Sequence, residues 1–240
     1  MLNVLARARI SRVLDPLGQR LARTRLTPNL ITAVGTLGVM AGALVFYSHG
    51  WFFVGTLVIT VFVLADMLDG TVARARGVSG PWGAFLDSTS DRIADAAVFG
   101  ALIWWFFRGG DSAWLGLAAL LCLVSGAVVS YAKARAEGLG LSANVGFAER
   151  AERLIIVLVG TGLDGLGVPY VQAVALWFLV GATFLTVAQR FAEVYRQAHG
   201  VATLRQRRIE TGRRRNRQTP PRLRGGRWRG RRTRTGQRAS

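Results

Sequence analysis

Long apolar segments constrain this chain more than any other feature of its sequence. Within lipid, every backbone N–H and C=O must find a hydrogen-bond partner inside the protein, and α-helices of roughly 20 residues satisfy this requirement. The sequence therefore predicts an all-α integral membrane bundle rather than a soluble domain. Its six transmembrane helices are expected at about 29–48, 51–72, 84–106, 113–134, 151–167 and 169–190.

The positive charge is distributed unevenly along the chain. The formal net charge of +18 would suit a nucleic-acid binder. However, fifteen arginines and a single acid, Glu210, lie within residues 201–240, so most of the excess belongs to one segment. We expect this arginine-rich tail, residues 200–240, to be disordered and attracted to anionic membrane lipids, with no nucleic-acid partner.

The N-terminal segment, residues 1–26, alternates apolar residues with arginines at roughly helical spacing. This pattern predicts an amphipathic helix on the membrane surface, bent at Pro16, although a frayed basic leader is the alternative. The six-helix domain then occupies residues 27–199. Basic residues flank alternate loops, so the positive-inside rule places both termini on the cytoplasmic side of the plasma membrane. They include Arg74 and Arg76, Lys133 and Arg135, and Arg150 and Arg153.

Four aspartates lie where the second and third apolar runs meet. Asp66 and Asp69 are three residues apart and Asp87 and Asp91 are four apart, so each pair lies on one face of a helix. The short link 76–82 turns the chain back and brings the two pairs to the same depth. Ionisable groups at such positions are costly and usually functional, and converging carboxylates suit a hard cation such as Mg²⁺ or Mn²⁺.

Small residues accompany these acids. Gly70 and Ala73 share the helical face of Asp66, and Gly83 shares the face of Asp87. Small side chains permit either close helix packing or a ligand groove, and the four neighbouring acids favour the groove.

The motif D-x-x-D-G-x-x-A-R-x₈-G-x-x-x-D-x-x-x-D, complete in residues 66–91, resembles the signature of the CDP-alcohol phosphatidyltransferase family. The stretches 62–70, 130–137 and 146–154 look closest to its actinobacterial phosphatidylinositol phosphate synthases, and the likeness covers residues 10–200. It implies a six-helix membrane fold, usually a homodimer. The implied reaction transfers a phosphatidyl group from CDP-diacylglycerol to 1D-myo-inositol 3-phosphate and releases CMP.

The resemblance also implies roles for individual residues. Asp66, Asp69, Asp87 and Asp91 would hold two divalent metal ions, and Asp91 would also take the proton from the inositol hydroxyl. The CDP-diacylglycerol pocket would be lined by Asn29, Leu30, Ile31, Thr32, Gly70, Arg74 and Gly80.

The acceptor carries its own phosphate, so its pocket requires positive charge. Lys133, the only lysine of the chain, together with Arg153 and Arg190, lies at the cytoplasmic helix ends, and arginine forks suit phosphate oxygens. Ser130 shares a helix face with Lys133 and would donate a hydrogen bond to the acceptor. These cations could instead be ordinary positive-inside anchors.

Three alternatives remain open from the sequence. The acceptor could be another alcohol, such as glycerol 3-phosphate in a phosphatidylglycerophosphate synthase. The acids could line the path of a divalent-cation transporter, although they gather at one membrane face. A purely structural membrane scaffold is the third, and it predicts no effect of Asp91→Asn.

Overall fold

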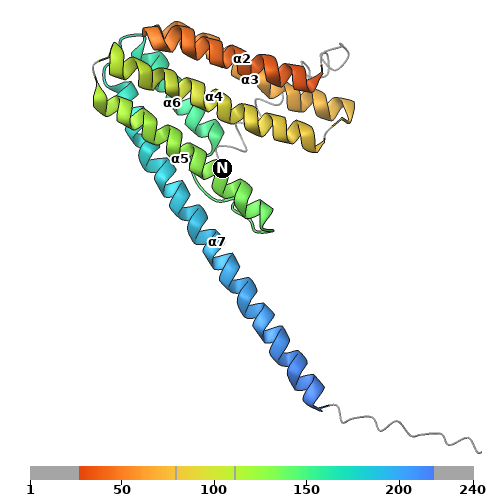
Figure 1. Ribbon diagram of the computed structural model, residues 1–240. Coiled ribbons are helices and arrows are strands. Elements are labelled where there is room, and N and C mark those ends of the chain that lie inside the picture. Colours follow the sequence, from red (N-terminus) through yellow and green to blue (C-terminus); the bar gives the residue numbers. More distant parts are fainter. Residues whose placement is uncertain (1–26, 79, 111, 219–240) are drawn as a thin grey trace, which may run out of the picture. The chain divides into compact units, whose positions relative to one another are not determined.

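The computed structural model describes residues 27–78, 80–110 and 112–218, with side chains as far as residue 200. All regular structure within these ranges is helical, which confirms the predicted all-α class (Figure 1). The predicted N-terminal amphipathic helix, residues 1–26, lies outside the described residues. The elements are α2 (Pro28–Phe46), the short 3₁₀ turn η1 (Tyr47–His49), α3 (Phe52–Arg76), α4 (Pro81–Arg108), α5 (Ala113–Gly138), α6 (Arg150–Asp164) and α7 (Val171–Gln218).

The helix ends follow local rules of sequence. Thr27 caps α2 by accepting a hydrogen bond from the Leu30 amide, and Pro28 occupies the first helical position. Gly77 ends α3 in the left-handed conformation with φ of 65°. Pro81 opens α4 a few residues later, so the 76–82 link turns the chain back as the sequence predicts.

Four of the described helical segments are long and apolar enough to cross a membrane: Pro28–His49, Phe52–Arg76, Ala113–Gly138 and Val171–Gly200. Two of the six expected spans do not meet that measure. One of them, α4, carries three aspartates and Arg92 between residues 87 and 95. The other, α6, has only 15 residues, so it is about 22 Å long against a hydrocarbon core of about 30 Å.

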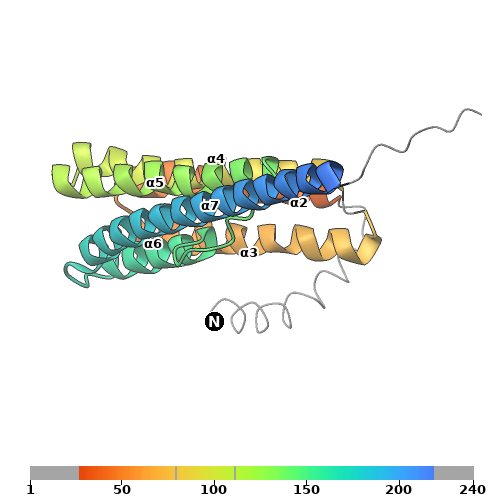
Figure 2. The ribbon, with the colours of Figure 1, turned by 90° about the horizontal axis from the view of Figure 1, so that it is seen from below.

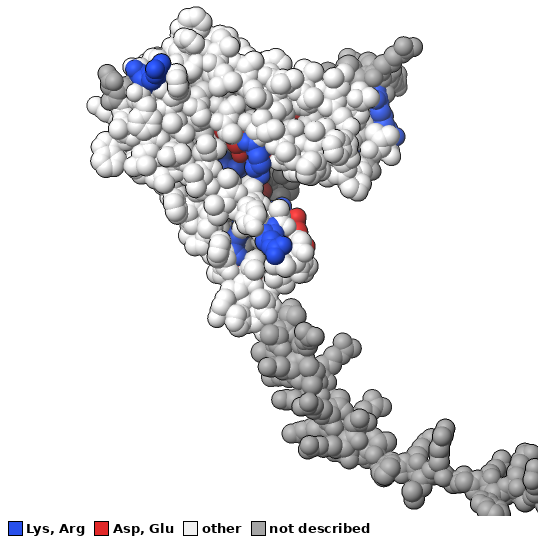
Figure 3. Space-filling model, in the orientation of Figure 1, with Lys and Arg blue, Asp and Glu red and all other residues white. Residues whose placement is uncertain are grey.

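The outward side chains are strongly apolar. Leu37, Val61, Trp114 and Val174 are each more than 60% exposed, which is costly in water and ordinary in lipid. On the face shown in Figure 3, charged atoms occupy only a few places on an otherwise uncharged surface, and acidic and basic atoms meet in a central recess. Together with the four long apolar helices, this surface marks a multi-pass membrane protein.

Close helix packing holds α3 and α4 in place. The N-terminal half of the bundle centres on α2, which packs against both helices, while α3 also packs against α6 and α4 against α5 (Figures 1 and 2). A Cβ on Gly38 would lie 2.1 Å from the Phe62 ring, so only glycine permits this approach of α2 to α3. Buried Ile59, Val98 and Leu102 contribute to the apolar core between these helices.

Hydrogen bonds between buried side chains fix α7 against α5 and α6. Ser125 bonds to Thr183 at 2.7 Å, and Gln172 donates to Thr161 at 3.2 Å. The helix continues to Gln218, whereas we expected disorder from residue 200 onward. Arginine is a good helix former and the sequence has no proline in this part before Pro220, so the helix can propagate into the basic segment.

Candidate active site between α3 and α4

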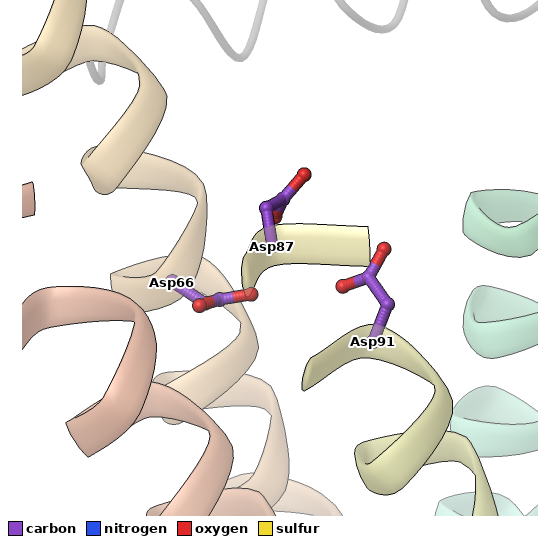
Figure 4. Close-up of side chains that lie close together, drawn as sticks. All are labelled: Asp66, Asp87 and Asp91. Carbon is purple, nitrogen blue, oxygen red and sulfur yellow. The ribbon is translucent and has the colours of Figure 1, made fainter. Parts of the chain in front are cut away.

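Three of the four predicted aspartates converge. Asp66 comes from the C-terminal half of α3, and Asp87 and Asp91 come from the N-terminal half of α4 (Figure 4). One carboxylate oxygen from each lies within 4.8 Å of the others. Like charges this close repel strongly unless a cation or proton compensates them. The predicted meeting of the two helix faces is thus present in the structure.

The donor set fits a hard divalent cation. Mg²⁺ and Mn²⁺ prefer oxygen ligands, and this cluster offers carboxylate oxygens from two rigid helices. The Asp66 Oδ1 atom is buried and has no hydrogen-bond partner. A buried carboxylate with an unpaired oxygen is costly, and a cation held by this cluster would stabilise the Asp66 charge.

Gly35 of α2 lies directly behind Asp66. A Cβ at position 35 would lie 2.9 Å from the Asp66 Cβ and 3.0 Å from its Oδ1. Real side chains essentially never approach so closely, so α2 can lie against Asp66 only because residue 35 is glycine. The backbone of α2 at Gly35 therefore limits the positions that the Asp66 carboxylate can adopt.

Asp69 stands apart from the group formed by the other three. One of its oxygens accepts a hydrogen bond from the Thr32 hydroxyl of α2, and the other accepts one from the Gly70 amide. These donors orient the carboxylate toward a cavity between α2, α3 and α4, which Asp87 also lines. Asp69 and Asp87 therefore link the carboxylate cluster to that cavity.

This cavity, which we call the Gly83 cavity, has a volume of about 550 Å³. Gly80 and Gly83 open onto it, since a Cβ on either would meet no atom within 4 Å, and these glycines leave space instead of packing. The exposed Arg74 guanidinium lies beside Gly70. The lining includes five predicted residues, Asn29, Thr32, Gly70, Arg74 and Gly80; the predicted Leu30 and Ile31 are not among the lining residues.

A second cavity of about 450 Å³, which we call the Ser130 cavity, lies between α4 and α5. Two predicted acceptor-binding residues line it, Ser130 and Arg153, together with Arg92 and Asp95. Ser88 and Thr89 of α4 reach it from the same turn that carries Asp87. The helix segment bearing the carboxylates thus borders both cavities.

The predicted phosphate-binding cations differ in their surroundings. Arg153 is 2% exposed, pairs with Asp95 at 3.1 Å and donates to the Ala148 carbonyl. Arg190 is also buried and donates to the backbone carbonyls of Val145 and Val129. Lys133 and Arg190 are not among the lining residues of the Ser130 cavity.

The sequence did not single out the Arg150 ion pair. The Arg150 Nη1 lies 2.6 Å from Asp91 Oδ1, and its Nε lies 3.3 Å from Asp95 Oδ1. Arg150 begins α6, after a capping box formed by Glu149 and Glu152. The i, i+4 spacing of Asp91 and Asp95 is the signal that could have suggested a cation shared by both carboxylates. No local pattern identifies that cation as Arg150, which lies more than fifty positions later in the sequence.

The comparison with protein families decides between the readings of this site. Residues 25–194 match the model of the CDP-alcohol phosphatidyltransferase family. The chain belongs to this family. The match includes the whole aspartate motif and every predicted site residue, so the resemblance found in the sequence is confirmed. The chain is thus a CDP-alcohol phosphatidyltransferase, an enzyme of phospholipid synthesis.

Close relatives of this phosphatidyltransferase carry a more specific name. The phosphatidylinositol phosphate synthase of Streptomyces avermitilis is 49% identical over 205 residues, covering 82% of this chain and 84% of the relative. The phosphatidylinositol phosphate synthase of Mycobacterium tuberculosis strain H37Rv is 45% identical over 197 residues, covering 81% and 91%.

Solved structures of the Mycobacterium tuberculosis phosphatidylinositol phosphate synthase share the fold of this phosphatidyltransferase. The complex with CDP-DAG superposes with a TM-score of 0.73 at 44% identity, covering 77% of this chain and 94% of the other. The complex with manganese and citrate superposes with a TM-score of 0.71 at 44% identity, covering 76% and 88%.

Proposed function

We propose that this chain is a phosphatidylinositol phosphate synthase. It transfers a phosphatidyl group from CDP-diacylglycerol to 1D-myo-inositol 3-phosphate and releases CMP. The observation that carries the proposal is the Asp66, Asp87 and Asp91 cluster, set on helices that border two separate cavities. Two relatives at 45% and 49% identity bear this enzyme name, which supports inositol phosphate as the acceptor.

In this proposal the four aspartates Asp66, Asp69, Asp87 and Asp91 hold two divalent ions, Mg²⁺ or Mn²⁺. The manganese complex of the Mycobacterium tuberculosis enzyme supports the choice of ion. Divalent ions there supply positive charge to the diphosphate, which stabilises the developing charge on the reacting phosphorus and on CMP. The hydrogen bonds from Thr32 and Gly70 fix the orientation of Asp69, as outer-shell donors do for metal ligands.

The Gly83 cavity is proposed to bind the CDP part of CDP-diacylglycerol. Arg74 supplies a positive charge at its edge, and the glycines leave room for the diphosphate to approach the backbone closely. Asn29 and Thr32, at the N-terminal end of α2, add polar groups to the lining. The Mycobacterium tuberculosis complex with CDP-DAG supports this substrate.

The acceptor is proposed to enter through the Ser130 cavity. The inositol hydroxyl oxygen attacks the phosphorus that bears the diacylglycerol group, and the bond from that phosphorus to the CMP oxygen breaks. Asp91 takes the hydroxyl proton; it lines neither cavity, but it lies one helical turn after Asp87 of the Gly83 cavity and next to Arg92 of the Ser130 cavity. Ser130, Lys133, Arg153 and Arg190 bind the acceptor and its phosphate.

The membrane arrangement is part of the proposal. The six helices α2 to α7 are the proposed membrane segments: α4 turns its charged half toward the site instead of lipid, and the short α6 spans the hydrocarbon core together with the turn that follows it. Both termini and the aspartates lie on the cytoplasmic side, which the distribution of arginines supports. We propose a homodimer from the family resemblance; mass photometry of the enzyme in nanodiscs would show one or two copies.

Purified full-length protein in detergent with Mg²⁺ and CDP-diacylglycerol tests the acceptor directly. CMP release is measured with inositol 3-phosphate, with free inositol and with glycerol 3-phosphate. We expect turnover with inositol phosphate alone. Turnover with glycerol 3-phosphate in its place would contradict the proposed acceptor and leave the transferase chemistry intact, whereas metal flux in proteoliposomes without CMP release would contradict both.

A further inference from the structure

Arg150 supports a further inference because its guanidinium contacts Asp91, one of the proposed metal ligands. Its Nη1 lies 2.6 Å from Asp91 Oδ1, and the Asp91 side chain is only 16% exposed. Arg92 is the other cation near Asp91, but its closest nitrogen lies 3.8 Å away. The short contact to Arg150 is therefore the main neutralising interaction of Asp91 in the structure.

The position of Arg150 is secured independently of Asp91. Its Nε contacts Asp95 Oδ1 at 3.3 Å, and the other oxygen of Asp95 pairs with Arg153 at 3.1 Å. Asp95 thus holds two arginines, one on each oxygen. If the contact to Asp91 is broken, Asp95 still retains the Arg150 side chain within the site.

We propose that Arg150 is a built-in counter-ion that holds Asp91 when no metal is bound and gives it up to the divalent cation. A doubly charged ion shared by Asp66, Asp87 and Asp91 gains more from these carboxylates than a single guanidinium does. On metal binding the Nη1 donor leaves Asp91 while the Nε contact to Asp95 stays. Arg150 is a positioning residue: in the absence of metal its positive charge reduces the repulsion among the three carboxylates and so keeps them close together.

The inference rests on the proposed metal site. The Arg150–Asp91 contact competes with the metal ion, so it should lower the affinity of the site for that ion. A site that is closed in about nine of ten metal-free molecules binds its ligand about tenfold more weakly than the open site would. Removing the guanidinium should therefore tighten metal binding while destabilising the metal-free protein.

The test measures Mn²⁺ binding to the full-length enzyme by electron paramagnetic resonance, without either substrate. We expect Arg150→Gln to bind Mn²⁺ about tenfold more tightly than the wild type. Arg150→Lys keeps the charge but loses the fork that spans two carboxylates, so it should also bind more tightly than the wild type. Arg135→Gln, which removes an exposed arginine, is the matched control for net charge and should leave the affinity unchanged.

The outcomes separate this inference from the metal site itself. Mn²⁺ binding that is the same in the wild type and both Arg150 variants would overturn the inference and leave the metal site standing. Binding by none of the proteins would overturn the metal site. If the Arg150 variants do not fold, wild-type structures with and without Mn²⁺ decide: an Arg150–Asp91 contact that persists with Mn²⁺ bound contradicts the exchange.

Discussion

The two cavities on either side of the carboxylates are built on different principles. The Gly83 cavity owes its shape to absent side chains, since Gly80 and Gly83 face open space and Arg74 is exposed. The Ser130 cavity has a buried charged wall, where Arg153 is already paired with Asp95. Substitutions should therefore act differently in the two cavities. In the Gly83 cavity they should change substrate binding, whereas in the Ser130 cavity they should also break a buried ion pair.

The largest expected effect is that of Asp91, which belongs to the carboxylate cluster and lines neither cavity. Asp91→Asn removes a charged ligand and the proposed base, so CMP release should fall by at least about 10³-fold. The variant should still fold, as judged by size-exclusion chromatography and thermal unfolding. Asp164→Asn, the same chemical change at the end of α6, is the control and should keep its activity. Retained turnover in Asp91→Asn would favour a structural role for the site.

On the Ser130 side, Arg153→Gln should damage stability and acceptor binding together. It leaves buried Asp95 with one partner fewer, and breaking a buried pair costs roughly 3–5 kcal/mol. We expect a lower melting temperature and a KM for inositol phosphate raised about 100-fold. The double variant Arg153→Gln with Asp95→Asn should regain part of the stability but not the affinity. Full recovery of both would show that Arg153 serves only packing.

On the Gly83 side, Arg74→Ala should affect binding alone. Loss of a hydrogen bond to a charged group costs about 1.5 kcal/mol or more, so the KM for CDP-diacylglycerol should rise about tenfold. The melting temperature should stay within a degree or two, since Arg74 is exposed. The acceptor KM should not change, and a matching rise in both KM values would erase the distinction between the cavities.

The smallest effect is expected for Gly83→Ala. Its Cβ would meet no protein atom, and alanine favours the helix over glycine by up to about 1 kcal/mol. The variant should therefore unfold at a slightly higher temperature while its KM for CDP-diacylglycerol rises about twofold, because the methyl group enters the cavity. Gly138→Ala, at the end of α5 and also in open space, should show neither a higher nor a lower KM. Unchanged substrate affinity in Gly83→Ala would place the nucleotide elsewhere.

The sequence predicted the parts of this site that depend on local spacing. The helical period puts Asp87 and Asp91 on one face, and the link 76–82 brings them to Asp66, so the convergence of these three carboxylates followed from one short segment. The same reasoning located the small residues of the Gly83 cavity. Leu30 and Ile31 were assigned to the same pocket by the family resemblance alone; they are not among the residues that line this cavity, and their part in substrate binding stays a prediction.

Contacts between distant segments were harder to predict. The pairing of Arg150 with Asp91 depends on how α6 lies beside α4, which no periodicity encodes. The C-terminal end of the fifth span was also misplaced. The span was predicted to reach residue 167, because apolar residues follow Asp164, but the helix ends at Asp164. The buried partners of Arg190, two backbone carbonyls, carry no sequence signal at all.

The contact of Gly35 with Asp66 bears on how natural variants of this enzyme should be interpreted. Gly35 has no functional group and belongs to no part of the aspartate motif, yet a single added methyl group would collide with the first carboxylate of that motif. A change there would displace the Asp66 carboxylate, a proposed metal ligand, without removing it. A variant at position 35 would thus lie at a helix-packing position, where a folding defect is the usual explanation. Its measured defect would nevertheless be a loss of catalytic rate, because the Asp66 carboxylate is displaced.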